Sequence, residues 1–334
     1  MTWTAGGAAA PWRSVASSAD GTKFYAAGVG LWASTNSGVT WAARNGSAGW
    51  NFVTCSADGT KLVVSSGFYT PVFTSTDSGM TVTERASSLY SVDTIASSAD
   101  GTKLVVATPG QDIYTSADSG LTWVDQTESL GLTDGLFWSS VACSTNGTKI
   151  VAVVHGGWIY TSTDSGVTWT PRDSSRTWNS VASSADGTKL VAAVFNGPIY
   201  TSTNSGTNWT AGKINPDFAG GGSSTDTNIN RGWRSVACSA DGTKLVAVDN
   251  PGGGTNGLIY ISGVVIVPKL NIINLGSNVG VSWPYPSTGW TLQQSSNLTT
   301  ASWSPSSGVT NNGHSNYILT SPAGKMFFRL LSPP

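Results

Sequence analysis

Short stretches in which apolar and polar residues alternate recur along most of the chain, and turn residues separate them. In residues 178–209, the stretches 179–184, 190–195 and 199–203 show this alternation, and a fourth ends at Trp209. Alternation with a period of two predicts half-buried β-strands. The Gly-containing turns between them predict that the four strands, A to D in chain order, form one antiparallel sheet.

The same unit of about 40 residues occurs six times. Each copy has a tight turn of the Asp-Gly-Thr-Lys type between strands A and B, here called the A–B turn. These turns begin at residues spaced by 38, 42, 46, 40 and 55 positions: Asp20, Asp58, Asp100, Asn146, Asp186 and Asp241. A period near 40 residues made of short strands is typical of propeller blades. The sequence therefore predicts an all-β protein with a six-bladed β-propeller of four-stranded antiparallel blades.

A second turn, the C–D turn, has the pattern Ser-x-Asp-x-Gly-x-Thr-Trp. It occurs five times, centred on Asn36, Asp77, Asp118, Asp164 and Asn204, with Asn in place of Asp in two copies and Val82 in place of the Trp in the second. This pattern resembles the Asp-box of the bacterial neuraminidase repeat, which is found in sialidase-type propellers, sortilin-like receptors, xyloglucanases and photosystem II assembly factors. The resemblance covers residues 1 to about 267. It implies that the turn is a folding device whose carboxylate or amide accepts hydrogen bonds from its own turn, while the Trp packs between sheets.

The repeat stops after residue 267, which predicts a propeller domain over 1–267 and a second domain over 268–334. Alternating stretches separated by Gly, Ser, Pro and Asn in 268–334 predict a small β-sandwich. This tail resembles the Ig-like or fibronectin-like modules of secreted bacterial proteins.

Repeat six lacks a C–D turn, whereas residues 2–5 match the strand-D ends of other repeats. We therefore expect Trp3 to supply the outer strand of the last blade; the alternative is an outer strand at 264–267.

Composition excludes several classes of function. The net charge is −1 and only 10% of residues are charged, so the clustered Lys and Arg of a nucleic-acid-binding surface are missing. No apolar run approaches the roughly 18 residues of a membrane span. The first residues do not read as a signal peptide. The polar, weakly charged composition nevertheless favours an extracellular or cell-surface protein whose signal is not present in this chain.

Cysteine and histidine give no sign of a metal or redox site. Cys55, Cys143 and Cys238 stand where other repeats have serine, so they are expected to be small buried thiols too far apart for disulfides. His155 and His314 are isolated. We expect neither a metal nor another cofactor.

The two faces of a propeller differ in chemistry. Because successive strands alternate in direction, the A–B and C–D turns share one face, and the B–C and D–A connections share the other, here called the loop face. At the start of strand A, three residues before its central Val or Ile, five of the six repeats have a tryptophan, followed by a residue that varies. The candidate ligand-binding residues are Trp12, Arg13, Trp50, Asn51, Asp93, Trp138, Trp178, Asn179, Trp233 and Arg234.

Aromatic rings beside planar polar groups are the chemistry of sugar binding, because rings stack on C–H faces and polar groups bond hydroxyls. The alternative is that each tryptophan packs between neighbouring blades. Loop length adds a second indication of a binding face. The spacing between the tryptophan of strand D and the tryptophan of the next strand A is 9 residues at Trp41–Trp50, but 15 at Trp123–Trp138 and 24 at Trp209–Trp233.

The leading hypothesis is a non-catalytic binding propeller whose partner is a glycan. The second is a structural or protein-interaction module that binds a protein partner on the same face. A glycoside hydrolase comes third, since the chain has only two glutamates, Glu84 and Glu128, and lacks the arginine triad and Tyr–Glu pair of sialidases. The aspartates that the loop face offers to such chemistry are Asp93, Asp112, Asp134, Asp217, Asp226 and Asp249.

Overall fold

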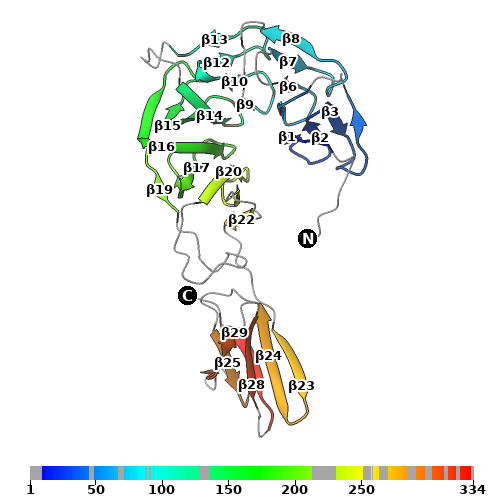
Figure 1. The fold of residues 1–334 in the computed structure, drawn as a ribbon, viewed down its shortest axis with the longest axis vertical. Coiled ribbons are helices and arrows are strands. Elements are labelled where there is room, and N and C mark those ends of the chain that lie inside the picture. The colour runs from blue at the N-terminus through cyan, green and yellow to red at the C-terminus, as the bar shows by residue number, and fades with distance from the viewer. Residues whose placement is uncertain are drawn as a thin grey trace. The chain divides into compact units, whose positions relative to one another are not determined.

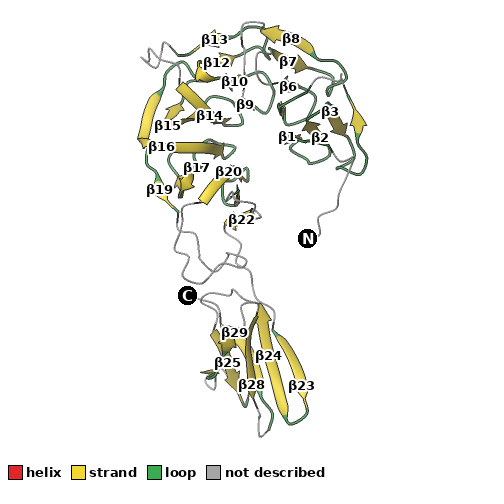
Figure 2. Cartoon of the chain, in the orientation of Figure 1, coloured by secondary structure: helices red, strands yellow, loops and turns green. Residues whose placement is uncertain are grey.

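The computed structural model describes residues 10–44, 49–66, 71–86, 89, 92, 94–127, 136–212, 231–250, 257, 259–262, 270–284, 291–297, 303–311, 315–320 and 324–331. Strands are the regular elements of these residues, and no helix occurs among them (Figure 2). The described residues up to Ser262 belong to one compact unit, and those from Leu270 onward belong to a second. The domain boundary predicted at residue 267 lies outside the described residues.

Repeats one to three each form a separate four-stranded antiparallel sheet, in which the strands pair in chain order. The first sheet consists of β1 (Ser14–Ser17), β2 (Phe24–Ala27), β3 (Leu31–Ser34) and β4 (Ala42–Ala43). The second consists of β5 (Phe52–Cys55), β6 (Leu62–Ser65), β7 (Val72–Ser75) and β8 (Thr83–Ala86). The third consists of β9 (Thr94–Ser97), β10 (Leu104–Ala107), β12 (Ile113–Ser116) and β13 (Val124–Asp125). Four-stranded antiparallel sheets are therefore confirmed here.

Repeats four to six differ from the expected isolated blades, because their strands and β11 (Pro109–Gln111) form one sheet of ten hydrogen-bonded strands. The remaining strands are β14 (Leu136–Cys143), β15 (Ile150–Ser162), β16 (Thr170–Ser183), β17 (Leu190–Gly197), β18 (Ile199–Ser202), β19 (Thr210–Ala211), β20 (Arg231–Cys238), β21 (Leu245–Asp249) and β22 (Ile259–Ser262). Within this sheet, repeats four and five keep four strands each, as segments of β14–β16 and β16–β19, and repeat six has three described strands, β20–β22.

The continuity arises on the loop face. There the B–C connection of one repeat pairs with the start of strand A in the next, as Gly157 does with Arg176 and Phe195 with Gly232. Backbone N–H and C=O groups of a short connection need partners, and the neighbouring strand supplies them. Figure 1 shows the sheets of the first unit side by side in an arc, with β1–β4 at one end and β20–β22 at the other.

The A–B turn is built by an aspartate that bonds its own turn. The Asp58 carboxylate accepts hydrogen bonds from the Ser56 hydroxyl at 2.5 Å and the Thr60 N–H at 2.9 Å. Gly59, between Asp58 and Thr60, has a φ of 67°, a left-handed conformation that suits glycine. Because these contacts lie within five residues of sequence, the motif specifies the turn locally.

The C–D turn uses the same principle over a longer span. The Asp164 carboxylate accepts from the Ser162 hydroxyl at 2.8 Å and the Thr168 N–H at 2.9 Å. Asn36 accepts the equivalent bond from the Thr40 N–H, also at 2.9 Å. The hydrogen bonds that the sequence pattern implied are therefore present with either an amide or a carboxylate as acceptor.

The core of the first unit lies between neighbouring repeats. Strand B is buried on both faces, as β6 and β10 show, because it is central in a sheet that has another sheet on each side. Each junction has its own apolar cluster; that of repeats one and two joins Tyr25 and Leu31 to Trp50 and Val53. Stability in such an array is a sum over neighbours, so a repeat at an end is less covered.

The second unit contains two antiparallel sheets. Their strands are β23 (Asn271–Leu275), β24 (Asn278–Pro284), β25 (Thr291–Ser295), β26 (Ser304–Pro305), β27 (Thr310–Asn311), β28 (Ser315–Thr320) and β29 (Phe327–Leu331). One sheet has the order β23-β24-β28-β27 and the other has the order β26-β25-β29. Val281, Trp283 and Ile318 of the first sheet share a buried cluster with Leu292 of the second.

Candidate functional site

The tryptophans at the start of strand A lie in the cores of the junctions. Each meets an aromatic ring of strand C in its own repeat edge to face: the ring centroids are 5.2 Å apart for both Trp50–Phe73 and Trp178–Tyr200. Trp50, Trp138 and Trp178 also share a buried cluster with residues of the preceding repeat, as Trp178 does with Val151 and Val153. Four of these tryptophans are at most 3% exposed: Trp50, Trp138, Trp178 and Trp233.

This burial decides between the two interpretations of the tryptophan ring. A sugar stacks on an accessible aromatic face, and these four rings offer none. The four rings instead pack between repeats, which is the alternative that the sequence left open. Repetition was the misleading signal, because a residue that recurs in every junction serves the junction. Trp12 differs, since its side chain is 37% exposed.

The polar neighbours of these tryptophans have different surroundings. The Asn179 side-chain amide donates to the backbone carbonyls of Trp233 at 2.9 Å and Arg234 at 3.2 Å, which ties repeat five to repeat six. The Arg234 guanidinium lies over the Phe195 ring, 5.4 Å from its centroid. Arg13 is exposed and Asn51 is half-buried. Asp93 lies outside the described residues.

Repeat four carries two exposed aromatic side chains on the loop face that the repeat pattern did not single out. Phe137 precedes Trp138 on β14 and is 63% exposed, and Trp158 lies in the B–C connection and is 45% exposed. At the place of Phe137, the other repeats have Pro, Gly, Ser or Thr, and at the place of Trp158 they have Gly30, Pro71, Asp112, Pro198 or Leu258. The signal was therefore available as a departure from the repeat.

The D–A connection of repeat four holds Trp158 in place. Trp158 stands between the paired residues Gly157–Arg176 and Ile159–Arg172 of β15 and β16. The Ser175 hydroxyl donates to the Gly156 carbonyl at 2.8 Å. The aromatic side chain is thus carried by backbone that is fixed on both sides, which reduces the entropy lost on binding.

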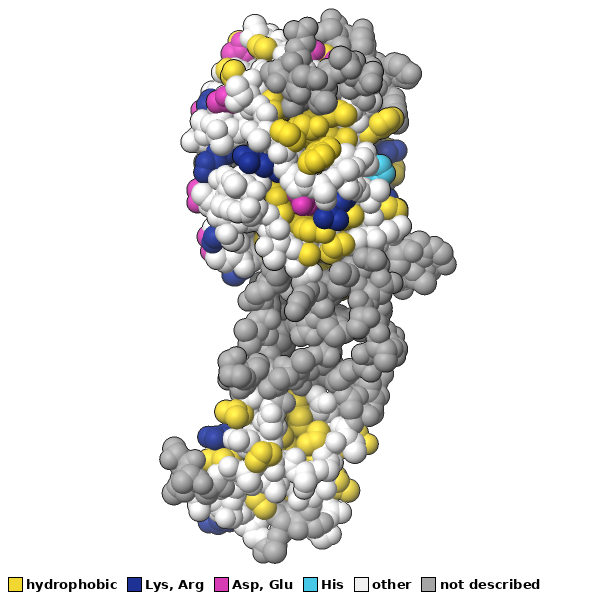
Figure 3. All heavy atoms as spheres, turned by 90° about the vertical axis from the view of Figure 1, so that its left-hand side faces the viewer, with side chains coloured by type: hydrophobic (Ala, Val, Ile, Leu, Met, Phe, Trp, Pro, Cys, Tyr) yellow, Lys and Arg dark blue, Asp and Glu magenta, His cyan; other side chains and the backbone are white. Residues whose placement is uncertain are grey.

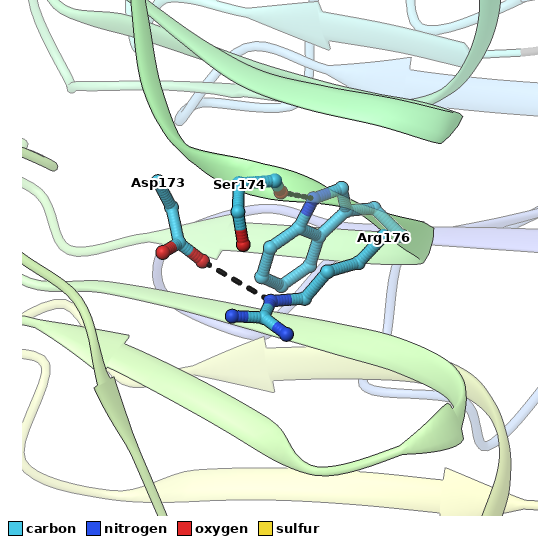
Figure 4. Close-up of polar contacts among 4 residues, drawn as sticks. Asp173, Ser174 and Arg176 are labelled. Carbon is cyan, nitrogen blue, oxygen red and sulfur yellow. Dashed lines mark hydrogen bonds and ion pairs between the residues drawn. The ribbon is translucent and has the colours of Figure 1, made fainter.

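A compact polar cluster completes this part of the face (Figure 4). The Asp173 carboxylate lies 3.4 Å from Nε of Arg176, and the Arg176 guanidinium lies over the Tyr200 ring, 4.7 Å from its centroid. The Trp178 indole N–H donates to the Ser174 carbonyl at 3.3 Å. Asp173 has a φ of 54°, an uncommon conformation that aspartate tolerates. The cluster thus presents an arginine and an acid in a fixed turn.

Figure 3 shows the side of the first unit on which β16 and β19 lie. Hydrophobic side chains gather there, and Lys or Arg and Asp or Glu side chains lie between them. Mixed apolar and charged surface of this kind is typical of binding sites on protein surfaces.

The aspartates of the opposite face are structural. Hydrogen bonds from Ser56 and then Thr60 lower the pKa of Asp58 to about 2, and equivalent bonds lower that of Asp100 to about 2. On the loop face, the Tyr114 hydroxyl donates to Asp112 at 3.2 Å, and burial, followed by the Asp112 charge, raises the pKa of Tyr114 to about 12. Asp249 is buried. The other predicted loop-face aspartates, Asp134, Asp217 and Asp226, lie outside the described residues.

The described residues contain no group of three His, Cys, Asp or Glu side chains placed to hold a metal ion. All three cysteines are free thiols. Burial raises the pKa of Cys143 to about 12, so its thiol is a poor nucleophile at neutral pH. In the part of the chain that the structure describes, no helix is long and apolar enough to cross a membrane.

No protein-family model matches the sequence. No curated protein matches it either. Similar solved structures exist at low identity. A GH74 enzyme from Niastella koreensis has 12% identity and a TM-score of 0.59, covering 94% of this chain and 53% of that one. The GH74 xyloglucanase of Xanthomonas campestris has 14% identity and a TM-score of 0.56, covering 85% and 53%. The chain thus spans about half the length of these GH74 structures.

YCF48 from Cyanidioschyzon merolae matches over most of both chains, with 16% identity, a TM-score of 0.52, and coverage of 81% of this chain and 92% of that one. A structure of YCF48 bound to D1 peptide has 16% identity, a TM-score of 0.51 and coverage of 81% and 90%. At this identity the likeness concerns the fold alone. It supports a β-propeller fold for the antiparallel sheets of the first unit.

Proposed function

We propose that this chain is a non-catalytic binding protein that recognises carbohydrate on its loop face at repeat four. The observation that carries the proposal is the exposure of Phe137 and Trp158 at two positions where none of the other repeats has an aromatic residue. An exposed aromatic side chain costs solvation free energy unless a ligand covers it, and both residues belong to the same repeat.

The surroundings suit a sugar. Aromatic rings stack on the C–H faces of pyranosides, and planar polar groups bond their hydroxyls. Arg176 and Asp173 supply such groups beside the β15–β16 pairing that holds Trp158. Arg234, which the sequence singled out, lies over Phe195 in the adjacent junction and extends the polar surface toward repeat six.

A protein partner on the same face is the second proposal. It is supported by the YCF48 structure with bound D1 peptide, whose chain is covered almost completely. Exposed aromatic residues beside arginines are also enriched at protein interfaces. The two proposals differ in the ligand class and share the residues.

Glycoside hydrolysis is a third and weaker candidate, and its support is the structural similarity to GH74 enzymes. It needs two carboxylates placed across a scissile bond. Of the loop-face aspartates that the sequence singled out, Asp112 accepts from Tyr114 and Asp249 is buried. Asp173, in the D–A connection of repeat four, pairs with Arg176. These engagements favour binding without turnover.

The proposal also covers the architecture of the whole chain. We assign the C–D turns to the Asp-box type, the first unit to six blades and the tail to a small Ig-like sandwich. We also propose that the protein lies outside the cell or at its surface, because both the weakly charged, polar composition and a glycan ligand fit that location.

The test is binding of the full chain to a glycan array that includes xyloglucan and sialylated oligosaccharides. The variants are Trp158→Ala and Phe137→Ala, and the matched control is Leu121→Ala, an exposed apolar residue on a C–D turn of the opposite face. We expect the two loop-face variants to lose about tenfold or more in affinity, equivalent to one stacking contact, while the control is unchanged.

Each outcome separates the three candidates. Silence on the array together with binding to a protein partner that Trp158→Ala abolishes would replace the glycan by a protein. Release of a chromophore from an aryl glycoside by the unmodified chain would establish the hydrolase. Binding that survives both loop-face substitutions would move the site away from repeat four.

A further inference from the structure

A cavity of about 330 Å³ lies between repeats three and four, at the end of the junction that carries the A–B and C–D turns. Repeat three lines it with strands B, C and D, and repeat four lines it with strands A and B and with both turns. Small-molecule sites have volumes of roughly 300–1,000 Å³, so the cavity is large enough for a ligand. Neither Phe137 nor Trp158 lines it, because both belong to the loop face.

The corresponding spaces of the next two junctions are smaller. The space between repeats four and five measures about 10 Å³, and that between repeats five and six measures about 180 Å³. Equivalent positions line all three spaces, since Lys149 and Lys189 stand there in the place of Lys103. The large cavity is therefore a property of one junction and not of the repeat in general.

One residue of strand D accounts for the contrast between this junction and the next. The third residue after the tryptophan of the C–D turn is Arg172 in repeat four, and its Nε donates to the Thr161 hydroxyl at 3.0 Å. In repeat three the same position is Gln126, whose side-chain amide donates to the Thr115 hydroxyl at 2.8 Å. Glutamine makes the equivalent hydrogen bond with a shorter side chain. The space that the arginine fills in repeat four therefore stays open in repeat three.

The walls of the cavity carry aliphatic side chains. In repeat one, the arginine at this position, Arg44, reaches across the junction and donates to the Met80 sulfur at 2.8 Å, on the C–D turn of repeat two. The counterpart of Met80 in repeat four is Val167, which lines the cavity and is 60% exposed. Val124 lines it from strand D of repeat three and is 57% exposed, where the other repeats have alanine or threonine. Apolar surface on both repeats thus borders the open space.

The charge at this junction also differs from that at the others. In four junctions, the positive charge of the turn lysine acts on the aspartate carboxylate of the next A–B turn; these pairs are Lys23–Asp58, Lys61–Asp100, Lys149–Asp186 and Lys189–Asp241. Between repeats three and four, the uncharged Asn146 replaces the aspartate. Lys103 is therefore the turn lysine whose charge the next A–B turn does not balance.

Lys103 is held beside the cavity by repeat four. A Cβ atom added to Gly147 would lie 2.7 Å from the Lys103 Cβ, so the lysine stem packs against the A–B turn. The Lys103 Nζ donates to the Ser165 hydroxyl on the C–D turn at 3.0 Å. An ammonium group has three N–H donors, so two remain for a ligand. Among the residues that line the cavity, all of which the structure describes, Lys103 alone is charged.

We propose that this cavity binds an aliphatic carboxylic acid, whose carboxylate pairs with Lys103 and whose hydrocarbon chain lies between Val124 and Val167. The chain removes the apolar surface of both valines from water, which favours binding. The carboxylate supplies the negative charge that is missing at Asn146, and a charge-assisted hydrogen bond from an ammonium group is stronger than one between neutral groups. A cationic head group would instead be repelled by Lys103.

Calorimetric titration of the full chain with octanoate tests the site. We expect one molecule per chain to bind with a dissociation constant below about 1 mM. Octylammonium has the same chain with the opposite charge, and acetate has the head group without the chain. We expect both to bind about tenfold more weakly or worse, because each lacks one of the two contacts. Octylammonium that binds as tightly as octanoate would overturn the proposal.

Two substitutions give this junction the residues that other repeats have, so both variants are expected to fold. Gln126→Arg fills the cavity as Arg172 does in repeat four, and should abolish octanoate binding. Asn146→Asp restores the carboxylate beside Lys103, and should weaken binding about fivefold or more. The matched control is Asp186→Asn, which removes the carboxylate beside Lys149 at the junction that has no room for a ligand. We expect this control to bind one octanoate with unchanged affinity.

The outcomes separate this site from the proposed carbohydrate site. Octanoate binding that survives Gln126→Arg would lie elsewhere on the chain and would overturn the proposal. Absence of octanoate binding to the unmodified chain at millimolar concentration would overturn it as well. Trp158→Ala and Phe137→Ala should leave octanoate binding unchanged, so failure of either proposal leaves the other standing.

Discussion

The side-chain amide of Asn179 donates to the backbone carbonyl of Trp233 at 2.9 Å, across the junction between repeats five and six. The residue beside a core tryptophan therefore holds the next core tryptophan in place. Asn179 also donates to the Arg234 carbonyl at 3.2 Å, so one side chain satisfies two acceptors of the neighbouring strand. A position chosen for its variability between repeats is here part of the scaffold.

Removal of this contact should lower stability. We expect Asn179→Ala to lower the free energy of unfolding by about 1 kcal/mol, because the partly buried Trp233 carbonyl and the exposed Arg234 carbonyl both lose their donor. Asn51→Ala is the matched control, since the described residues give the Asn51 side chain no hydrogen-bond partner. Urea unfolding followed by fluorescence measures both. Equal stability of the two variants would show that Asn179 is dispensable.

Substitution of a buried tryptophan should lower stability, whereas substitution of the exposed Trp158 should lower binding and leave stability almost unchanged. Trp178→Ala removes a fully buried ring and is expected to cost about 3–5 kcal/mol, the range for large core truncations. Trp158→Ala removes a side chain that is 45% exposed and should stay within about 0.5 kcal/mol of the unmodified protein. Thermal unfolding measures the first effect, and the glycan array measures what the second variant loses. A large loss of stability in Trp158→Ala would make its binding defect uninformative.

The local turns were predictable from sequence, and the accessibility of the tryptophans was not. Asp58, Gly59 and Thr60 form a turn whose bonds close within a few residues, so the motif alone determines it. The burial of Trp178 depends on Val151 and Val153 of the preceding repeat, which sequence alternation does not place. The motif alone therefore determines the local turns, whereas packing of the tryptophans between repeats was one of two alternatives that the sequence left open.

The candidate site shows a different limit of sequence reasoning. Phe137 and Trp158 do not recur, so a search for repeated residues passes over them. They become visible when each repeat is compared with the others position by position, because no other repeat has an aromatic residue at either position. The side-chain exposure of 63% and 45% then separates them from the core aromatics.

Acid should destabilise the first unit through its A–B turns. The pKa of Asp58 and that of Asp100 are both lowered to about 2 by hydrogen bonds from serine and threonine. A depressed folded-state pKa stabilises the protein above the unfolded value of about 3.9, and this contribution is lost as pH falls toward 2. We expect the melting temperature to fall steadily between pH 4 and pH 2.

A matched substitution isolates this effect. Asp58→Asn with Asp100→Asn keeps the acceptor, as Asn146 does naturally by accepting the Thr148 N–H at 3.1 Å, and removes the titrating group. The double variant should melt near the unmodified temperature at pH 7 and show a shallower decline below pH 4. An identical acid profile would assign the decline to other carboxylates.

The cysteines should be slow to react in the native protein. Burial, the largest cause, raises the pKa of Cys55 to about 11 and that of Cys143 to about 12, so little thiolate exists at pH 8. We expect a chromogenic disulfide reagent to label these two thiols slowly in native protein and all three rapidly in denaturant. Rapid native labelling of Cys143 would indicate that the junction between repeats three and four opens easily.

The outer strand of repeat six remains the most direct test of the sequence reasoning. In the described residues β22 pairs with β21 alone, whereas β3, β7, β12 and β18 each pair with an outer strand as well. An outer strand shields the edge of a sheet from pairing with other chains, and the match of residues 2–5 to other strand-D ends predicts that Trp3 belongs to this strand. Deletion of residues 1–6 should therefore lower the melting temperature by several degrees, since about 1 kcal/mol corresponds to roughly 2–4 °C in a domain of this size. Trp3→Ala should produce a part of the same shift, because it removes the side chain and leaves the backbone to pair. An unchanged melting temperature in both variants would instead favour residues 264–267 as the outer strand.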